Sequence, residues 1–346
     1  MKKHVKIFEC KKGDIIADDI FNDYGILIVP KNAPVNDYVI DKLIQFGIYN
    51  VNIYNQKYTD SKGDPQRITQ LKNKYESNVS SIKEVINELA TGKEINYDKI
   101  KAISDSVYLN VTSNYSLIEC IHNLRNFDEY TYTHSINVSI YAMLLSRWLD
   151  MNEKDIENTV MSGILHDIGK AKIQKNILNK EGPLSPKEFD IIKTHTVLGY
   201  DIVKNIAELN LEIKKAVLLH HEKDNGKGYP LGFEGSKLNM YTKIISVVDV
   251  YDALTSNRCY KKKITPFDCF KQIQMMGIGH FDIKVVSTFL YNIANYYIGS
   301  KVAMSNDEIG EVVFIVPSNI SRPIVRIKNN FVDLCTDNTL KIVEML

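Results

Sequence analysis

The sequence predicts a mainly α protein in which a long helical region is flanked by a small α+β domain and a small β module. From about residue 116 to 298, apolar residues recur at i, i+3, i+4 and i+7, which is the spacing of amphipathic helices. Residues 1–56 combine strand-like apolar runs with one helical segment that ends at Gly47, and residues 299–346 return to short strand-like runs. The 346 residues are enough for two or three domains.

Residues 57–115 are interpreted as a linker followed by connecting helices. The stretch QKYTDSKGDPQR contains the turn-forming residues Gly63, Asp64 and Pro65, and the helical patterns after it carry few apolar residues. These helices could form a stalk or the surface of a homodimer, or they could pack against the next domain. The sequence leaves both alternatives open.

The overall charge argues against a protein that binds long nucleic acid. Lys and Arg number 43 against 42 Asp and Glu, so an anionic ligand must be bound by a local cluster. No stretch approaches the about 20 apolar residues of a membrane helix, and no apolar run follows the basic residues at the start. The 5 scattered cysteines fit neither a disulfide framework nor a metal knuckle, so we expect a reduced, cytoplasmic protein.

The histidines point to a metal site. Of 8 histidines, five fall between residues 134 and 221, and neutral imidazole is a common metal ligand. The clearest local signal is the pair His166-Asp167 at the end of the apolar run SGILHDIGK, where Gly169 is expected to let the backbone leave the helix. An adjacent His-Asp pair is common by chance, so its weight depends on similar residues elsewhere. Further polar residues adjoin apolar helical faces at His134, His195, His220, His221 and Asp249.

Shared cations explain these seven residues together. An unpartnered polar side chain against a core costs several kcal/mol, so each of them needs a partner. One such residue alone is more often a hydrogen-bonded core residue, by roughly three to one. Imidazole and carboxylate without thiolate suit iron, manganese or zinc. Seven ligands fit two metals about 3.5–4 Å apart, bridged by a carboxylate and a hydroxide, and such sites favour phosphoester hydrolysis.

The same residues resemble a known family. HDIGK, then HHEKDNGKGYP from His220 to Pro230, then DVYDAL, is similar to the HD-GYP branch of the HD-domain phosphohydrolases, with five separated blocks in the expected order. The resemblance runs from about residue 125 to 298 and implies an all-helical HD-type catalytic domain, which we assign to the helical region 116–298. Residues 1–56 are similar to a small domain often found ahead of it, and 299–346 resembles its usual β tail.

The resemblance also implies a reaction and a set of site residues. Family members hydrolyse cyclic di-GMP to pGpG and often on to GMP, and some act on cyclic GMP-AMP instead. Two divalent ions are implied, with iron expected and manganese as the alternative, and Asp167 bridges them. Lys170 would contact the scissile phosphate, while Arg258 and Lys261 would hold the phosphates of the substrate. The implied metal ligands are His134, His166, Asp167, His195, His220, His221 and Asp249.

Three positions depart from the family pattern. Tyr130 stands where some relatives have a glutamate that binds a third metal, so two ions are expected. The loop reads Asn-Gly-Lys-Gly-Tyr-Pro from Asn225, where the family commonly has Asp-Gly-Thr/Ser-Gly-Tyr-Pro, which concerns loop conformation or substrate contact. Cys259 replaces the usual proline of an Arg-Pro-Tyr turn, and nothing in the sequence explains that change.

Several smaller predictions have bland alternatives. Tyr229 is counted as a substrate contact that stacks on guanine, although an aromatic residue beside Gly-Pro packs locally as often. Asp252 is counted with it, but it could instead support a metal ligand or pair with a cation. Glu222 could orient a ligand histidine or be solvated. The loop around Tyr229 shapes the mouth of the site or offers a surface to a protein partner. Lys170, Arg258 and Lys261 have the alternative of being ordinary solvated side chains.

Two rival functions remain. The first is a module that binds cyclic di-GMP or a partner without turnover, and the filled set of seven ligands argues against it. The second is an HD hydrolase that acts on another nucleotide, and the HHE and GYP block argues against that. The sequence does not decide the metal, the number of hydrolytic steps, the preference between cyclic di-GMP and cyclic GMP-AMP, the role of the N-terminal domain or the oligomeric state.

Overall fold

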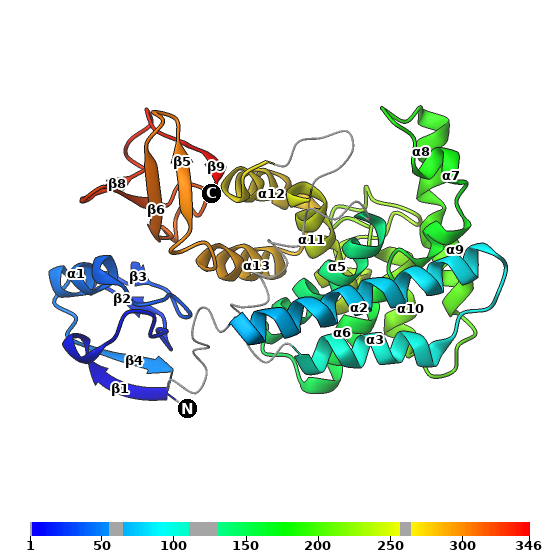
Figure 1. Ribbon diagram of the computed structural model, residues 1–346, viewed down its shortest axis with the longest axis horizontal. Helices are drawn as coiled ribbons and strands as arrows, with labels where there is room; N and C mark the ends of the chain where they lie inside the picture. The colour runs from blue at the N-terminus through cyan, green and yellow to red at the C-terminus, as the bar shows by residue number, and fades with distance from the viewer. Residues whose placement is uncertain (1, 55–64, 111–129, 257–263) are drawn as a thin grey trace. The chain divides into compact units, whose positions relative to one another are not determined.

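The protein is described by a computed structural model that covers residues 2–54, 65–110, 130–256 and 264–346 (Figure 1). The chain divides into two compact units. One unit joins the two ends of the chain, and the other is helical. The first comprises Met1–Gly63, Ile264–Gln272 and Leu290–Leu346, and the second comprises Asp64–Lys263 and Ile273–Phe289. The mainly α fold with strand-rich ends is confirmed, and the boundaries of the four predicted segments remain a prediction.

The first unit contains two small antiparallel ladders, the helix α1 and a five-stranded sheet, together with parts of two helices that it shares with the second unit. In the N-terminal part, Asn36 begins the helix by accepting a hydrogen bond from the backbone N–H of Val39, a usual N-cap. The sheet is antiparallel throughout, in the order β8-β7-β6-β5-β9. The elements are β1 (Lys2–Lys6) paired with β4 (Asn50–Tyr54), β2 (Ile20–Phe21) paired with β3 (Leu27–Val29), the 3-10 helix η1 (Ile7–Glu9), α1 (Asp37–Gln45), β5 (Lys301–Met304), β6 (Ile309–Phe314), β7 (Ile324–Ile327), β8 (Asn330–Asp333) and β9 (Ile342–Met345).

The two ends of the chain share one hydrophobic core. Phe314 and Ile324 of the C-terminal sheet belong to the same buried cluster as the N-terminal apolar residues. The Asn36 amide donates to the carbonyl of Val313 at 2.6 Å, and the Lys42 ammonium lies 4.1 Å from the centre of the Phe314 ring. The α+β residues and the β tail therefore bury their apolar faces against each other, which explains why segments so far apart in sequence form one unit.

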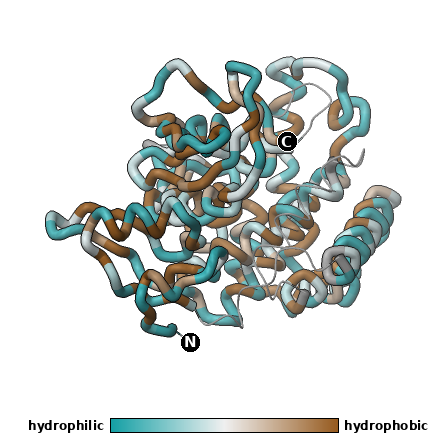
Figure 2. Tube along the Cα trace, turned by 60° about the vertical axis from the view of Figure 1, so that its left-hand side comes forward, coloured by the Kyte–Doolittle hydropathy of each residue, from teal (hydrophilic) through white to brown (hydrophobic). Residues whose placement is uncertain are grey.

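The helical unit is built around α5, whose side chains are buried along most of its length. Helix α5 packs against α6, α11 and α2. Apolar residues, brown in Figure 2, alternate with hydrophilic ones along much of the chain. The helices are α2 (Pro65–Ala90), α3 (Tyr97–Asn110), α5 (Tyr130–Trp148), α6 (Glu153–Leu165), η3 (Ile168–Lys172), α7 (Lys175–Leu178), α8 (Pro186–Lys193), α9 (His195–Val203), α10 (Leu211–Leu219), η4 (Gly235–Lys237) and α11 (Met240–Thr255), with α12 (Pro266–His280) and α13 (Ile283–Asn295) divided between the units.

Asparagine caps fix where three of these helices begin. The side chains of Asn152, Asn210 and Asn239 each accept a hydrogen bond from the backbone N–H three residues later, at the starts of α6, α10 and α11. Such caps satisfy backbone donors that have no partner within the helix. Because α6, α10 and α11 carry predicted ligands on them or at their ends, the caps help to fix the register of the site.

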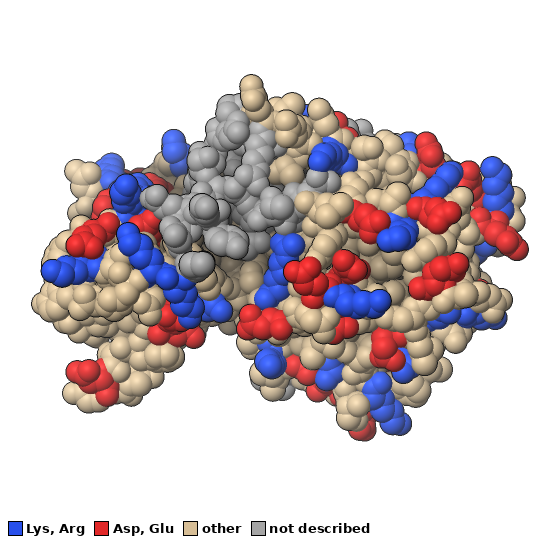
Figure 3. All heavy atoms as spheres, turned by 90° about the horizontal axis from the view of Figure 1, so that it is seen from below, with Lys and Arg blue, Asp and Glu red and all other residues tan. Residues whose placement is uncertain are grey.

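Two further features are the distribution of charged side chains on the surface and the hydrophobicity of the helices. Basic and acidic side chains are interspersed over the face seen in Figure 3, among the residues it describes. No helix in the described ranges is long and apolar enough to cross a membrane.

Close contact between α5 and α6 depends on Gly163. A Cβ atom at this position would lie 2.6 Å from Ser139 Cα. We therefore expect Gly163→Ala to lower the free energy of unfolding by about 1–3 kcal/mol, because the extra methyl group overpacks a backbone contact. Denaturant unfolding followed by circular dichroism measures this change. The matched control is Gly277→Ala in α12, where the nearest atom is Val286 Cγ1 at 3.9 Å, and it should be neutral or stabilising by up to about 1 kcal/mol. Equal effects of the two substitutions would contradict the close helix contact.

Candidate metal centre

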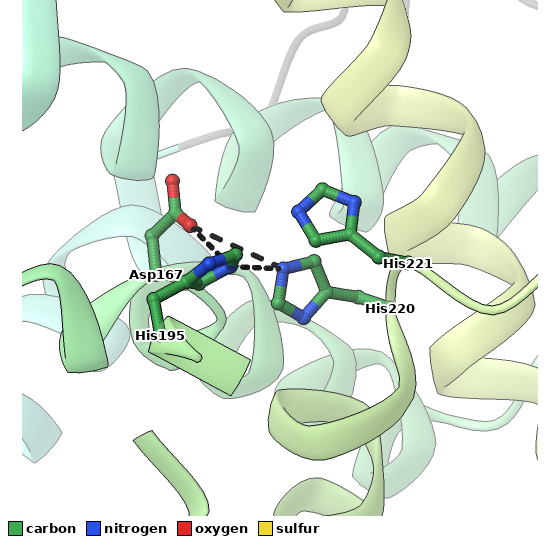
Figure 4. Close-up of side chains that lie close together, drawn as sticks. All are labelled: Asp167, His195, His220 and His221. Carbon is green, nitrogen blue, oxygen red and sulfur yellow. Dashed lines mark hydrogen bonds and ion pairs between the residues drawn. The ribbon is translucent and has the colours of Figure 1, made fainter. Parts of the chain in front are cut away.

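The side chains predicted as metal ligands converge on one place from five helices. His134 lies on α5, His166 follows the last residue of α6, and Asp167 precedes η3. His195 begins α9, whereas His220 and His221 follow α10 and Asp249 lies on α11. Figure 4 shows Asp167, His195, His220 and His221 pointing toward one another. The cluster thus joins residues that lie up to 115 positions apart in the chain, from His134 to Asp249.

The cluster consists of two groups that share Asp167. In one group, ligand atoms of Asp167, His195, His220 and His221 all lie within 4.8 Å of one another, and in the other those of His134, His166 and Asp167 do so. Asp167 Oδ1 is 3.3 Å from His195 Nε2. Asp167 Oδ2 is 3.3 Å from His166 Nε2 and 3.5 Å from His134 Nε2. One carboxylate therefore presents a different oxygen to each group, which is how a bridging ligand lies.

Asp249 also lies between the two groups. Its Oδ1 atom is 3.1 Å from His134 Nε2, and its Oδ2 atom is 3.8 Å from His221 Nδ1. Asp249, on α11, thus lies near one histidine of each group, as Asp167 does. Two carboxylates and five imidazoles supply nitrogen and oxygen donors only, a set that suits first-row transition metals.

Three of the imidazoles have a defined orientation. Nδ1 of His166, His195 and His220 lies 2.7, 2.7 and 3.0 Å from a carbonyl oxygen three residues earlier in the chain. A carbonyl only accepts, so each Nδ1 carries the proton and donates, and each Nε2 is a lone pair turned toward the cluster. His195 Nε2 and His220 Nε2 face each other at 3.3 Å. Two facing lone pairs are compatible with a cation beside them, and a hydrogen bond on the far nitrogen is the usual support of a ligand histidine.

Two buried atoms in the cluster lack hydrogen-bond partners among the described residues. They are His166 Nε2 and Asp167 Oδ1. A buried acceptor without a partner costs about 1–3 kcal/mol, and more when it is charged. A bound cation would satisfy both atoms at once. The residues present therefore fit the metal ions that the sequence predicts.

The protonation of the cluster suits metal binding as well. Burial lowers the pKa of His195 and of His220, and it lowers the pKa of His221 to about 4, so these imidazoles are neutral near pH 7. Burial opposes ionisation of Asp167, but Lys170 and His166 outweigh it and hold the pKa of this carboxyl well below its usual range. Neutral imidazole and ionised carboxylate are the forms that bind a cation.

His134 differs from the other histidines because carboxylates surround it. Burial lowers its pKa, but hydrogen bonds to Asp249 and Asp252 outweigh burial and raise the pKa to about 9. Burial likewise opposes ionisation of Asp249, yet the hydrogen bond to His134 lowers the pKa of that carboxyl strongly. In the absence of a cation, a proton on His134 compensates for the negative charge of the two aspartates. A metal ion would take over that role.

Asp252 lies behind His134. Its Oδ2 atom accepts from His134 Nδ1 at 2.8 Å, its Oδ1 atom accepts from the Asn137 amide at 3.0 Å, and its exposed fraction is 0%. This position fits the alternative of a residue that supports a ligand, and it offers a substrate no surface to contact. Carboxylates often hold ligand histidines in this way.

Lys170 and Tyr229 lie at the edge of the cluster. The Lys170 ammonium is 2.5 Å from Asp167 Oδ2, and its side chain is 24% exposed. The Tyr229 ring packs against the His221 ring with 4.8 Å between their centres, so it packs locally and beside a predicted ligand at the same time. Arg258, Cys259 and Lys261 lie outside the described residues, as does the side chain of Tyr130.

Two residues have roles that the sequence did not indicate. Glu222 is 3% exposed, and its carboxylate accepts hydrogen bonds from the backbone N–H groups of Leu231, Gly232 and Phe233 at 2.7–3.0 Å. It neither orients a histidine nor is solvated, and it fixes the chain that follows the GYP motif. A Cβ atom at Gly228 would lie 2.4 Å from Glu222 Cα, so the first residue of GYP permits the loop to fold back on HHE.

Gly169 also acts differently from the expectation. Helix α6 has already ended at Leu165, and the chain continues into η3, so no glycine is needed to leave the helix. A Cβ atom at Gly169 would lie 1.9 Å from the carbonyl oxygen of His195 and 2.4 Å from the backbone nitrogen of Gly199. The glycine therefore permits η3 to touch α9, which brings Asp167 next to His195.

Comparison with known proteins identifies the helical region. Residues 117–285 match the model of the HD domain family. The chain is 32% identical to the cyclic di-GMP phosphodiesterase PA4108 of Pseudomonas aeruginosa over 216 residues, which cover 62% of this chain and 51% of that protein. It is 32% identical to a cyclic di-GMP phosphodiesterase of Thermotoga maritima over 182 residues, covering 50% and 49%. It is 29% identical to the 3'3'-cGAMP-specific phosphodiesterase 2 of Vibrio cholerae over 177 residues, covering 50% and 34%. The chain thus spans about half or less of the length of these relatives.

A solved structure shares the fold. Bd1817, a HDG"Y"P protein from Bdellovibrio bacteriovorus, aligns with a TM-score of 0.55 over 85% of this chain and 99% of that chain, at 16% sequence identity. At this identity the likeness concerns the fold alone. It extends beyond residues 117–285 and so includes part of the strand-rich ends.

The role of Glu222 in holding residues 231–233 can be tested by substitution. We expect Glu222→Ala to lower the free energy of unfolding by about 1.5–3 kcal/mol, because three backbone N–H groups lose a buried, charged acceptor. Thermal and denaturant unfolding measure the change. Glu208→Ala is the control, since Glu208 is exposed, and it should stay within about 0.5 kcal/mol of the parent. If both variants unfold like the parent, Glu222 does not hold the loop.

Proposed function

This chain belongs to the HD-GYP branch of the HD-domain family, and from that premise we propose that it is a metal-dependent phosphodiesterase that hydrolyses cyclic di-GMP. One observation carries the proposal: two groups of imidazole and carboxylate side chains, all buried except the half-buried His221, share Asp167, with unpartnered acceptors at His166 and Asp167. A pair of adjacent cation sites suits displacement at phosphorus. The curated relatives named above as cyclic di-GMP phosphodiesterases support this choice of substrate.

Two divalent ions are proposed, with iron expected and manganese as the alternative. When bound, such a pair supplies Lewis acidity toward a phosphoryl oxygen and a water of lowered pKa. The chain's own contribution is to hold neutral imidazoles and ionised carboxylates in place before the ions arrive. The proposed ligands are His134, His166, Asp167, His195, His220, His221 and Asp249, with Asp167 shared.

Lys170 is proposed to act on the substrate. Its ammonium lies at the edge of the cluster against Asp167 and is partly exposed, so it can reach a phosphate oxygen. There its charge would offset the negative charge that develops in the transition state. Tyr229 is proposed to border the substrate beside His221, and Arg258 and Lys261 are proposed to hold its remaining phosphate.

The finer points of the substrate and setting are proposals too. Cyclic GMP-AMP is the alternative substrate, because relatives specific for 3'3'-cGAMP also match. The product is pGpG, with GMP if hydrolysis continues. We place the protein in the cytoplasm, with a protein partner at the GYP loop and homodimer formation as further possibilities.

Metal content and turnover test the function together. Anaerobically purified protein should contain about two iron or manganese ions per chain and convert cyclic di-GMP to pGpG or GMP. Mass spectrometry measures the metal content, and chromatography measures the conversion. His166→Ala and Asp167→Ala should each lower metal content and reduce hydrolysis by at least about hundredfold. The control is His4→Ala, far from the cluster in sequence and bonded to Asn52. Unchanged turnover in either ligand variant would falsify the proposal.

The wild-type result discriminates between the alternatives. Metal without turnover of cyclic di-GMP would favour cyclic GMP-AMP or another phosphoester as substrate. Absence of metal and of turnover after anaerobic reconstitution would favour a module that binds without cleaving.

Lys170 can be separated from metal binding. Lys170→Gln should lower kcat by about 10²–10³-fold, because one preorganised charge at the reacting phosphate is lost, while metal content stays at two ions. Lys175→Gln, an exposed lysine five residues later, is the control and should keep its kcat. Steady-state kinetics on the metal-loaded proteins measure both. A variant with full kcat would show that Lys170 is an ordinary partner of Asp167.

A further inference from the structure

A buried chain of hydrogen bonds connects His134 to helix α2. The Tyr75 hydroxyl on α2 donates to Asn137 Oδ1 at 2.7 Å, and Asn137 Nδ2 donates to Asp252 Oδ1 at 3.0 Å. Asp252 Oδ2 in turn accepts from His134 Nδ1 at 2.8 Å. These four side chains, at most 5% exposed, belong to three helices, α2, α5 and α11.

The chemistry of these side chains allows only one direction of donation. A carboxylate accepts, so Asn137 must turn its NH₂ group toward Asp252 and its carbonyl oxygen toward Tyr75. Tyr75 is then the donor to Asn137. His134 must likewise carry a proton on Nδ1, which leaves Nε2 toward the cluster. Each member therefore fixes the orientation of the next, ending at a proposed metal ligand.

His134 depends on other helices in a way that three other ligands do not. Nδ1 of His166, His195 and His220 bonds to a carbonyl within the same stretch of chain, three residues earlier. Those imidazoles keep their orientation as long as their own turn of helix is formed. His134 Nδ1 bonds instead to a side chain of α11, which is held by Asn137 and, through it, by α2. Its orientation therefore responds to how α2 is packed.

Helix α2 also contacts η3, the short helix that follows the shared Asp167. The Lys172 ammonium on η3 donates to the carbonyl of Leu89 at 2.7 Å. Leu89 lies in the last turn of α2, where carbonyls lack partners within the helix. Lys172 is two residues after Lys170, in the short helix that follows Asp167. Tyr75 and Leu89 are about 21 Å apart along the helix at 1.5 Å per residue, so one helix contacts both a support of His134 and the short helix that follows the shared Asp167.

We propose that Tyr75 and Asn137 are positioning residues of the metal centre, which make the binding of the ion at His134 depend on the placement of helix α2. The inference rests on the proposed function. Tyr75 and Asn137 do not touch the substrate or the ions, and they act through Asp252. An ordinary buried hydrogen bond would contribute to folding, whereas this one also determines how well one of two ions binds.

The test uses Mn²⁺ alone as the probe, on the full chain. Competition with a chelator measures the affinity of each of the two ions, and electron paramagnetic resonance reports whether the two are spin-coupled. Tyr75→Phe removes only the hydroxyl and should weaken the more weakly bound ion about fivefold, the net effect of one hydrogen bond. Asn137→Ala should weaken it about 10–100-fold and shift the spectrum toward a single ion at limiting Mn²⁺.

Tyr241→Phe is the matched control. Tyr241 is also a buried residue of the helical unit, and its hydroxyl bonds to Asp155 and Asn158, neither of which is a proposed ligand. This variant should bind both ions like the parent, although its unfolding free energy falls. If Asn137→Ala does not fold, the isosteric Tyr75→Phe still decides the question.

The outcomes separate the inference from the function on which it rests. Weaker binding of one ion in Tyr75→Phe, with parental binding in Tyr241→Phe, supports the positioning role. Parental binding of both ions in Tyr75→Phe overturns it and leaves the proposed function intact. A parent protein that binds no Mn²⁺ overturns the proposed function and this inference together.

Discussion

The burial of four imidazoles and two carboxylates where five helices meet, with His221 half-buried beside them, constrains the whole helical unit. Their lone pairs and charges face one another, and two acceptors, His166 Nε2 and Asp167 Oδ1, have no hydrogen-bond partner in the described structure. Such an arrangement is costly unless cations bind, so its surroundings must hold it in place beforehand. The Nδ1 donors, the asparagine caps and the close contacts at Gly163 and Gly169 all serve that purpose, since each fixes an element that carries a ligand.

The ligands differ in what fixes them, and this difference organises the site. His166, His195 and His220 are oriented by backbone carbonyls of their own segment, so their geometry forms as soon as those helices form. His134 is oriented by side chains from other helices, so its geometry forms only with tertiary packing. The orientation of His195 and His220 therefore depends on their own segments of chain, whereas the orientation of His134 depends on the packing of other helices. The two proposed cation sites, which share Asp167, can in this way differ in affinity and in sensitivity to distant changes.

Local patterns in the sequence were sufficient to predict the mainly α fold and to single out the seven candidate ligands. Apolar periodicity is a property of one helix at a time, and a histidine on an apolar face such as His195 is visible without its neighbours. The roles of Gly169 and Glu222 were not predictable, because they depend on which backbone segments approach each other after folding. The shared core of residues 1–54 and the C-terminal sheet was equally hidden, since it joins apolar faces that lie about 250 residues apart.

Helix α2 has a particular place in the helical unit, because it contacts both a support of His134 and η3. The N-terminal residues fold with the C-terminal sheet as one unit, and α2 is the first described element of the helical unit after them. A helix transmits displacement along its length because its backbone hydrogen bonds resist local bending. A rotation or shift of α2 would therefore reach Tyr75 and Leu89 together. Because Tyr75 bonds to a support of His134 and Leu89 accepts from Lys172 of η3, which follows Asp167, such a movement would alter how the two groups of proposed ligands lie relative to each other.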